Sequence, residues 1–149
     1  MHGHDPADAL VGAGTAGFHV ARTSQEARDA FEPVFRQRLK VAERFGLPAV
    51  FPTLEDFVER SSALVGSPQQ IVEKVHRYHE SFGHSVMHLS AEASGLQAAS
   101  YRASLERFQS EIAPVLRREI PDPPWDWDSR TGVPSSSPSA DVLPALEGV

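Results

Sequence analysis

The sequence predicts an α/β fold in which two short parallel strands are flanked by long helices. Two β-like runs, residues 17–21 and 85–91, each lie directly before a helical segment. Apolar residues at helical spacing, with start and stop signals, predict helices over residues 24–45, 68–82 and 97–118. Because strand, crossover, parallel strand connections are almost always right-handed, we expect the two strands to lie side by side, with the helices packed on one outer face.

The helix over residues 68–82 has the clearest boundaries. Ser67 is placed to cap its first turn, Pro68 occupies the first helical position, where its missing N–H costs nothing, and Gln70 completes a capping box. Gly83 supplies a left-handed stop. The apolar residues expected on its buried face are Ile71, Val75, Tyr78 and Phe82.

The long connection between the two predicted strands is mostly helical. Thr23 and Glu26 form a capping box at its start, and Pro33 should kink the helix by removing one backbone hydrogen bond. A short capped helix is expected over residues 53–60. The apolar run at residues 63–65 that comes after it is too short to predict as a strand.

The two ends of the chain differ from its centre. Residues 1–13 lack a periodic pattern and are expected to form an irregular lead-in. Residues 120–149 are rich in proline and serine and have no apolar stripe long enough to pack, which is typical of a disordered tail. The folded domain is therefore expected over residues 14–119.

One glycine motif fits a nucleotide-binding fingerprint in spacing but not in context. Gly12, Gly14 and Gly17 match the G-x-G-x-x-G pattern, whose glycines let a pyrophosphate approach a helix N-terminus after a strand. Here nothing β-like precedes the motif, and a strand comes after it where a helix is required. We therefore interpret the motif as a flexible approach to the first strand.

Composition excludes several classes of function. The chain of 149 residues has a formal net charge of −6, which argues against a surface for nucleic acid or anionic membrane. It has no cysteine, which excludes disulfides, thiolate metal sites and a cysteine nucleophile. The sequence shows neither a membrane span nor a secretory signal pattern, so we expect a cytoplasmic protein.

Three segments, in this order, resemble the C-terminal portion of the bacterial luciferase-like, flavin-dependent monooxygenase family. They cover residues 17–28, 64–74 and 103–114. The resemblance implies a TIM-type (β/α)8 barrel that uses FMN, or the deazaflavin F420, and that usually dimerises. A complete barrel needs about 250 residues. We therefore expect the C-terminal part of such a barrel, about two parallel strands with flanking helices, as in a family member that has lost its front half.

The last predicted strand carries the candidate site, because TIM-barrel active sites gather at the carboxyl ends of the strands. Alternation places Val86, His88 and Ser90 on the face toward the barrel interior, and the residues between them on the helix-packed face. We expect His88 to hydrogen-bond substrate or flavin and Ser90 to contact the cofactor. Glu92 resembles a glutamate near the flavin in the luciferase catalytic subunit, and could orient a proton donor. The alternative for these residues is a satisfied polar rim.

A metal site is a further alternative on the helix over residues 68–82. His76, His79 and Glu80 have the spacing to hold one ion, but their charged neighbours favour a solvated helix face. No metal site is therefore predicted.

Three functions fit this pattern. The first is a piece of a monooxygenase that uses reduced flavin and O2 on a small organic substrate when another chain supplies the missing strands. The second is a non-catalytic interaction or dimerisation module derived from that family, and the third is a truncated product without function. Because unpaired strand edges invite pairing, we expect a homo-oligomer or a complementing chain, and FMN binding by this chain alone should be weak.

Overall fold

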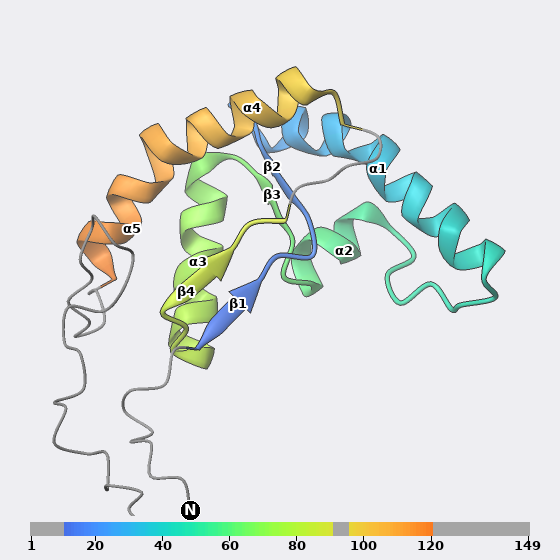
Figure 1. Ribbon diagram of the computed structural model, residues 1–149, viewed down its shortest axis with the longest axis horizontal. Coiled ribbons are helices and arrows are strands. Elements are labelled where there is room, and N and C mark those ends of the chain that lie inside the picture. The colour runs from blue at the N-terminus through green and yellow to red at the C-terminus, as the bar shows by residue number, and fades with distance from the viewer. Residues whose placement is uncertain (1–10, 91–95, 121–149) are drawn as a thin grey trace, which may run out of the picture.

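The computed structural model describes residues 11–90 and 96–120 (Figure 1). In chain order its elements are β1 (Gly12–Gly14), β2 (Phe18–Val20), α1 (Ser24–Arg44), α2 (Leu54–Arg60), β3 (Leu64–Gly66), α3 (Pro68–Phe82), β4 (Val86–His88), α4 (Ala98–Arg107), the π-helical turn η2 (Phe108–Ile112) and α5 (Ala113–Glu119). None of the described helices is long and apolar enough to cross a membrane. The predicted tail, apart from its first residue, lies outside the described residues.

The described strands form two parallel pairs rather than the predicted single pair. β1 pairs with β4, placing Gly12 beside Val86, and β2 pairs with β3, placing Phe18 beside Leu64. The predicted pairing of residues 17–21 with 85–91 is therefore wrong. The short apolar run at 63–65 does contribute a strand, and it takes the place beside β2 that was expected for the last strand.

The glycine motif is part of the sheet and not a flexible approach to it. β1 is extended by hydrogen bonds from Ser85 N to Val11 O (2.9 Å) and from Thr15 N to His88 O (3.0 Å). The expected irregular lead-in thus ends before Gly12. Glycine has low β-propensity, so the local sequence conceals a strand that pairing across more than seventy residues creates. The chain bends between β1 and β2 (Figure 1).

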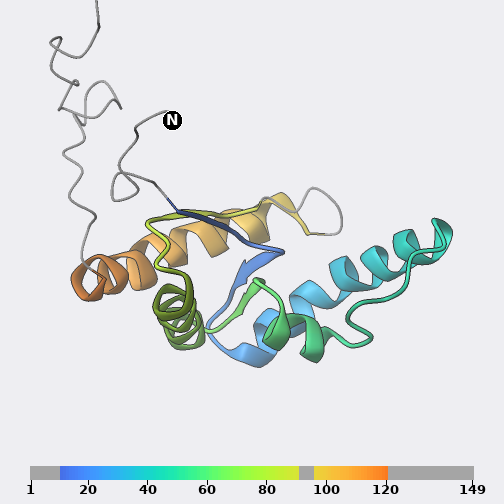
Figure 2. The same cartoon turned by 90° about the horizontal axis from the view of Figure 1, so that it is seen from below.

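Helices cover both faces of the β2–β3 pair, which corrects the prediction of a single outer face. Phe18, Val20 and Leu64 pack with Ile71, Val75 and Ile112, whereas Val65 packs with residues of α1 and α2. Figure 2 shows α1 and α3 on either side of these strands. Every residue of β2 and β3 is buried, and parallel strands of this kind need cover on both faces. Two strands are therefore sufficient here to pack against a helical layer on each face.

The predicted helix boundaries are largely confirmed. Thr23 Oγ1 accepts the Glu26 N–H (3.2 Å), Ser67 Oγ accepts the Gln70 N–H (3.5 Å), and Gly83 ends α3 with φ 58°. The predicted last helix, over residues 97–118, is interrupted by the π-helical turn η2. Pro114 is the second residue of α5, just after this turn, and because proline has no N–H it cannot donate to the carbonyl one helical turn before it.

Candidate functional site

One face of the β1–β4 pair is open, and we call the surface formed by Gly12, Gly14, Val86 and His88 the open face. In the parallel register Gly12 lies beside Val86 and Gly14 beside His88, so the four residues point to the same side. All four are exposed. A Cβ added at either glycine would meet nothing within 4 Å. The open face is therefore a flat strip of backbone, bordered by one aliphatic and one imidazole side chain.

The predicted alternation along the last strand is confirmed for residues 86–89. Val86 and His88 point to the open face, while Met87 and Leu89 pack on the other side against the core cluster that contains Phe18. His88 makes no side-chain hydrogen bond with another described residue. Both of its ring nitrogens can therefore contact a ligand at the open face. Glu92, the third predicted site residue, lies outside the described residues.

Ser90 is held by Thr15, which sequence reasoning did not single out. The Ser90 N–H donates to Thr15 Oγ1 (2.9 Å), and the Ser90 hydroxyl donates to the Thr15 carbonyl oxygen. Thr15 is buried, and its own N–H donates to the carbonyl of His88 (3.0 Å). These bonds hold the carboxyl end of β4 against Thr15, the residue that comes directly after β1. They thereby fix the position of the His88 backbone. They also occupy the one proton of the Ser90 hydroxyl.

A second polar cluster lies at the free edge of β2, away from the open face. Ser104 of α4 lies 3.1 Å from both the N–H and the carbonyl oxygen of Val20, and 3.0 Å from His19 Nδ1. The Ser104 hydroxyl thus makes the two hydrogen bonds with the Val20 backbone that a neighbouring strand would otherwise make. Burial lowers the pKa of the His19 imidazole, so this ring is neutral at pH 7. Sequence reasoning missed both residues, because the partners are 85 positions apart.

Lys74 is a buried cation with a structural role. It donates hydrogen bonds to the carbonyl oxygens of Val58 and Ala63 (2.7 Å for the latter) and so joins α3 to the end of α2 and the start of β3. Burial lowers the pKa of this ammonium group to about 8; Arg77 adds to the shift and Glu59 opposes it. Its position between two residues of the apolar stripe was the signal in the sequence that it would be buried.

The glycine motif and the histidines of α3 do not form the nucleotide site or the metal site that were considered from the sequence. Gly17 packs against α1, where an added Cβ would come within 2.7 Å of Phe31 Cζ. The glycine motif therefore contains β1 and, directly before β2, one close contact with α1; a strand comes after it, and not the helix of a dinucleotide fingerprint. His76 Nε2 lies 3.0 Å from Glu119, whereas His79 Nδ1 meets the carbonyl of His84. Among the described residues no cluster of three or more side chains could hold a metal ion.

The open face suits the ring of a flat cofactor. Two glycines without neighbouring atoms let a planar system lie directly on the strand backbone, and His88 at the border offers a donor and an acceptor to its polar edge. The four residues of this face carry no cation for a phosphate group.

Comparisons with known proteins relate this chain to one family of enzymes. A family model described as luciferase-like monooxygenase matches residues 1–85, which is more than half of the chain. The structure is similar, with 26% sequence identity and a TM-score of 0.52, to the oxygenating constituent of 3,6-diketocamphane monooxygenase from the CAM plasmid of Pseudomonas putida, a type II Baeyer–Villiger monooxygenase solved in complex with FMN. The match covers 69% of this chain and 33% of that one, so the matched part spans about a third of the relative. A search of curated proteins finds no match.

Proposed function

We propose, from the premise that this chain belongs to the luciferase-like monooxygenase family, that it is one part of a flavin-dependent monooxygenase. The reaction class is the oxidation of a small organic substrate by O2 and reduced flavin, with FMN as the flavin and F420 as the alternative. A bound flavin would supply the electrons and the activation of oxygen. The observation that carries this proposal is the open face, where glycines leave room for a ring beside an unpartnered histidine.

The two glycines and the histidine of the open face have separate roles in this proposal. Gly12 and Gly14 allow close approach of the ring, because no side chain rises from the strand there. His88 hydrogen-bonds the flavin or the substrate, and the Thr15–Ser90 bonds keep the strand that carries it in place. Glu92, four residues after His88, orients the proton donor. These assignments extend the fold relationship to particular side chains.

The proposed active form needs more barrel strands than the described residues contain. The match covers one third of the relative's length, so we propose that the remaining strands and the phosphate-binding groups come from elsewhere in the assembly. Val86 on the open face and Val11 next to it are 45% and 44% exposed, which gives a partner an apolar surface to cover. The absence of cysteine is compatible with a cytoplasmic setting.

The same exposed valines favour one other function, a non-catalytic dimerisation module. In that case the open face would be covered by protein and would never hold a flavin. The two functions differ in one expected result: substitutions at His88 and Gly14 weaken flavin binding by the complex only if the chain is part of the monooxygenase.

Flavin binding with and without the missing strands tests the proposal. The chain is titrated with FMN by fluorescence quenching, alone and after co-expression with the part of the Pseudomonas putida relative that it does not cover. We expect binding weaker than micromolar for the chain alone and a clear gain in the complex. Micromolar or tighter binding by the isolated chain would show that its own residues complete the site.

Two variants locate the site in the complex. Gly14→Val fills the floor of the open face with a residue that suits a strand, and His88→Ala removes the ring partner. Both are expected to weaken FMN binding by at least tenfold without changing the melting temperature by more than a few degrees, whereas Gln69→Ala on the exposed side of α3 should change neither. Unchanged FMN affinity in both variants would place the flavin elsewhere, and a complex that binds no flavin would favour the dimerisation module.

A further inference from the structure

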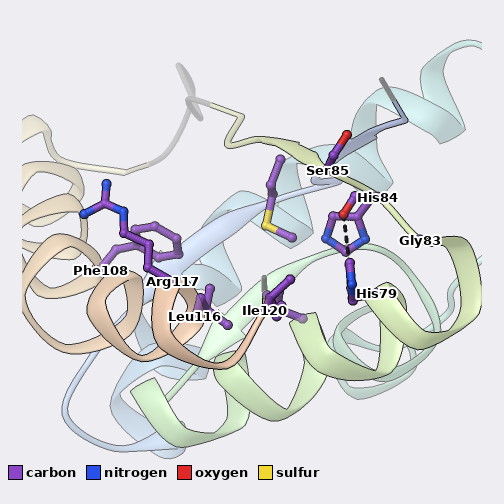
Figure 3. Close-up of a pocket in the computed structure, with 10 residues that line it drawn as sticks. His79, Gly83, His84, Ser85, Phe108, Leu116, Arg117 and Ile120 are labelled. Carbon is purple, nitrogen blue, oxygen red and sulfur yellow. Dashed lines mark hydrogen bonds between the residues drawn. The ribbon is translucent and has the colours of Figure 1, made fainter. Parts of the chain in front are cut away.

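A hollow of about 370 Å³ lies on the opposite side of β4 from the open face. One wall comes from the end of α3 and the start of β4, and the other from the α4–η2–α5 helix, as Figure 3 shows. Met87 lines this hollow, whereas its neighbours Val86 and His88 point to the open face. An occupant of the hollow therefore contacts the back of the strand that carries His88 and leaves the open face uncovered.

The lining of the hollow is apolar and only partly covered. Its aliphatic, thioether and aromatic side chains are Val75, Met87, Phe108, Leu116 and Ile120. All of these except Val75 are half-buried, so an occupant would remove from water the apolar surface that the other described residues leave accessible. The volume lies within the range of small-molecule pockets and has room for one indole ring.

The chain itself leads out of this hollow. Ile120, the last residue of the described range, lines the hollow near Leu116 (Figure 3). Its backbone is extended, with φ −106° and ψ 112°, because Pro121 comes next and the residue before a proline avoids the helical region. The segment that follows α5 therefore starts at the hollow, and its first side chains can reach back into it.

This next segment, residues 121–128, has the sequence Pro-Asp-Pro-Pro-Trp-Asp-Trp-Asp and lies outside the described residues. Trp125 is five residues after Ile120, so its Cα atom can lie at most about 17 Å from that of Ile120. The three prolines restrict the backbone, which lowers the entropy lost when the segment is ordered. Because a short tether gives an effective concentration of about millimolar, the indole of Trp125 has an advantage over any separate partner at micromolar concentration.

The charges around the hollow favour the same segment. It carries Asp122, Asp126 and Asp128 and no cation. None of the described residues that line the hollow is acidic, and Arg117 lies exposed on its rim, with the guanidinium directed away from the hollow (Figure 3). Arg117 makes no ion pair with another described residue, so it can meet an aspartate of a chain that crosses the rim. Exposed ion pairs contribute little, and the buried indole must supply most of the stabilisation.

We propose that Trp125, in the chain's own C-terminal segment, docks in this hollow, with the neighbouring aspartates near Arg117. The indole packs against Met87 and Phe108 and covers the apolar lining. Trp127 stays in water, because the hollow has room for one indole and Trp125 has the shorter tether. The docked segment supports β4 from the side opposite the open face, so the proposal does not depend on flavin binding there.

Tryptophan fluorescence reports on this segment alone, because Trp125 and Trp127 are the two tryptophans of the chain. In Trp127→Phe we expect the remaining Trp125 to have a blue-shifted emission and to be quenched by acrylamide about threefold less than Trp127 in the matched variant Trp125→Phe. Acrylamide is uncharged, so the aspartates do not bias the comparison. The chain also has two methionines, and a ring-current shift of the Met87 methyl resonance should be lost in Trp125→Ser while Met1 stays unchanged.

Variants of the hollow, made in the Trp127→Phe chain, then locate the docked indole. Leu116→Asp places a charge in the hollow and should raise the quenching of Trp125 to the level of a free indole, whereas Leu105→Asp, on the exposed side of α4, should not. Arg117→Glu changes only the exposed rim and should raise the quenching in part, so it tests the docking even if Leu116→Asp fails to fold.

The same fluorescence signal identifies which chain supplies the indole. Docking within one chain predicts an emission that does not change over a fiftyfold range of protein concentration, about 1 to 50 μM. A blue shift that grows with concentration would mean that a second copy fills the hollow, and would overturn the proposal. Equal quenching of Trp125 and Trp127, or stronger protection of Trp127, would overturn it as well.

Discussion

The two strand pairs of this protein share one extended segment and differ in almost every other respect. In β2–β3 every residue is buried, with α1 and α2 on one face and α3 with the π-helical turn on the other. In β1–β4 the outer residues of both strands are exposed and only the inner face is packed. The same stretch of backbone is thus buried in the core along β2 and has an exposed face along β1.

The residues of the shared segment account for this difference. Its buried half carries the large side chains Phe18 and Val20, which fill the space between the helices, whereas its exposed half carries Gly12 and Gly14. Glycine adds no apolar area to bury and no side chain that would obstruct a ligand. We conclude that β2–β3 determines stability and that β1–β4 is available for function, a division that matched mutations in the two pairs can test.

The largest difference should appear when one apolar residue from each pair is truncated. Phe18 is fully buried and meets Tyr101 and Phe108 edge-on, so Phe18→Ala is expected to cost about 3–5 kcal/mol of unfolding free energy. Val86 is 45% exposed, and Val86→Ala should cost less than about 0.5 kcal/mol. Urea unfolding followed by circular dichroism measures both. Similar losses in the two variants would mean that the open face is covered in solution.

Two glycines of the same motif offer a matched test of packing. In Gly17→Ala the new Cβ meets the Phe31 ring at 2.7 Å, and we expect a loss of about 1–3 kcal/mol from overpacking. In Gly14→Ala the new methyl group meets nothing within 4 Å, and stability should be unchanged within about 0.5 kcal/mol. The readout is again the urea midpoint. A loss at Gly14 equal to that at Gly17 would contradict the open face.

The sequence predicts the helices well because the signals that start and end them are local. Thr23, Ser67 and Gly83 act within one turn of their own positions, and each ends or begins a helix as expected. Strand pairing depends instead on distant partners. Nothing near Gly12 shows that it will pair with Val86, and the three residues of β3 are too few for a pattern. The predicted neighbours of the strands were wrong for this reason.

The candidate site likewise has features that local sequence predicts and others that depend on distant residues. Alternation alone predicts that His88 points away from Met87, since the strand period is local. The Thr15 hydroxyl that holds Ser90 and the Ser104 hydroxyl that closes the edge of β2 could not be predicted, because each acts across 75 or more positions. A buried serine in a helix gives no sign of its partner in the sequence.

Removal of the Ser104 hydroxyl should have a smaller effect than the changes in packing. Ser104→Ala leaves the N–H and carbonyl of Val20, and Nδ1 of His19, without this partner in a fully buried place, and we expect a loss of about 1–2 kcal/mol. Ser110→Ala is the control: its exposed hydroxyl only bonds carbonyls of its own helix, so stability should change by less than about 0.5 kcal/mol. If the control loses as much as Ser104→Ala, the strand-edge role of Ser104 is wrong.

The smallest effect concerns His19, the buried titrating group of the β2–β3 pair. Burial lowers the pKa of His19 in the folded chain below its ordinary value of 6.5, whereas the unfolded chain keeps that ordinary value. Between these two values the unfolded chain binds a proton that the folded chain does not, so stability falls as the pH is lowered below about 6.5. His19→Gln should reduce this dependence, although His84, whose pKa is also lowered, retains its own share. Val86→Ala changes the open face without removing a titrating group, and should leave the dependence as in the parent chain. Urea midpoints measured between about pH 5 and 8 test this prediction, and it fails if the two variants retain the same acid sensitivity, because the loss would then not be due to His19.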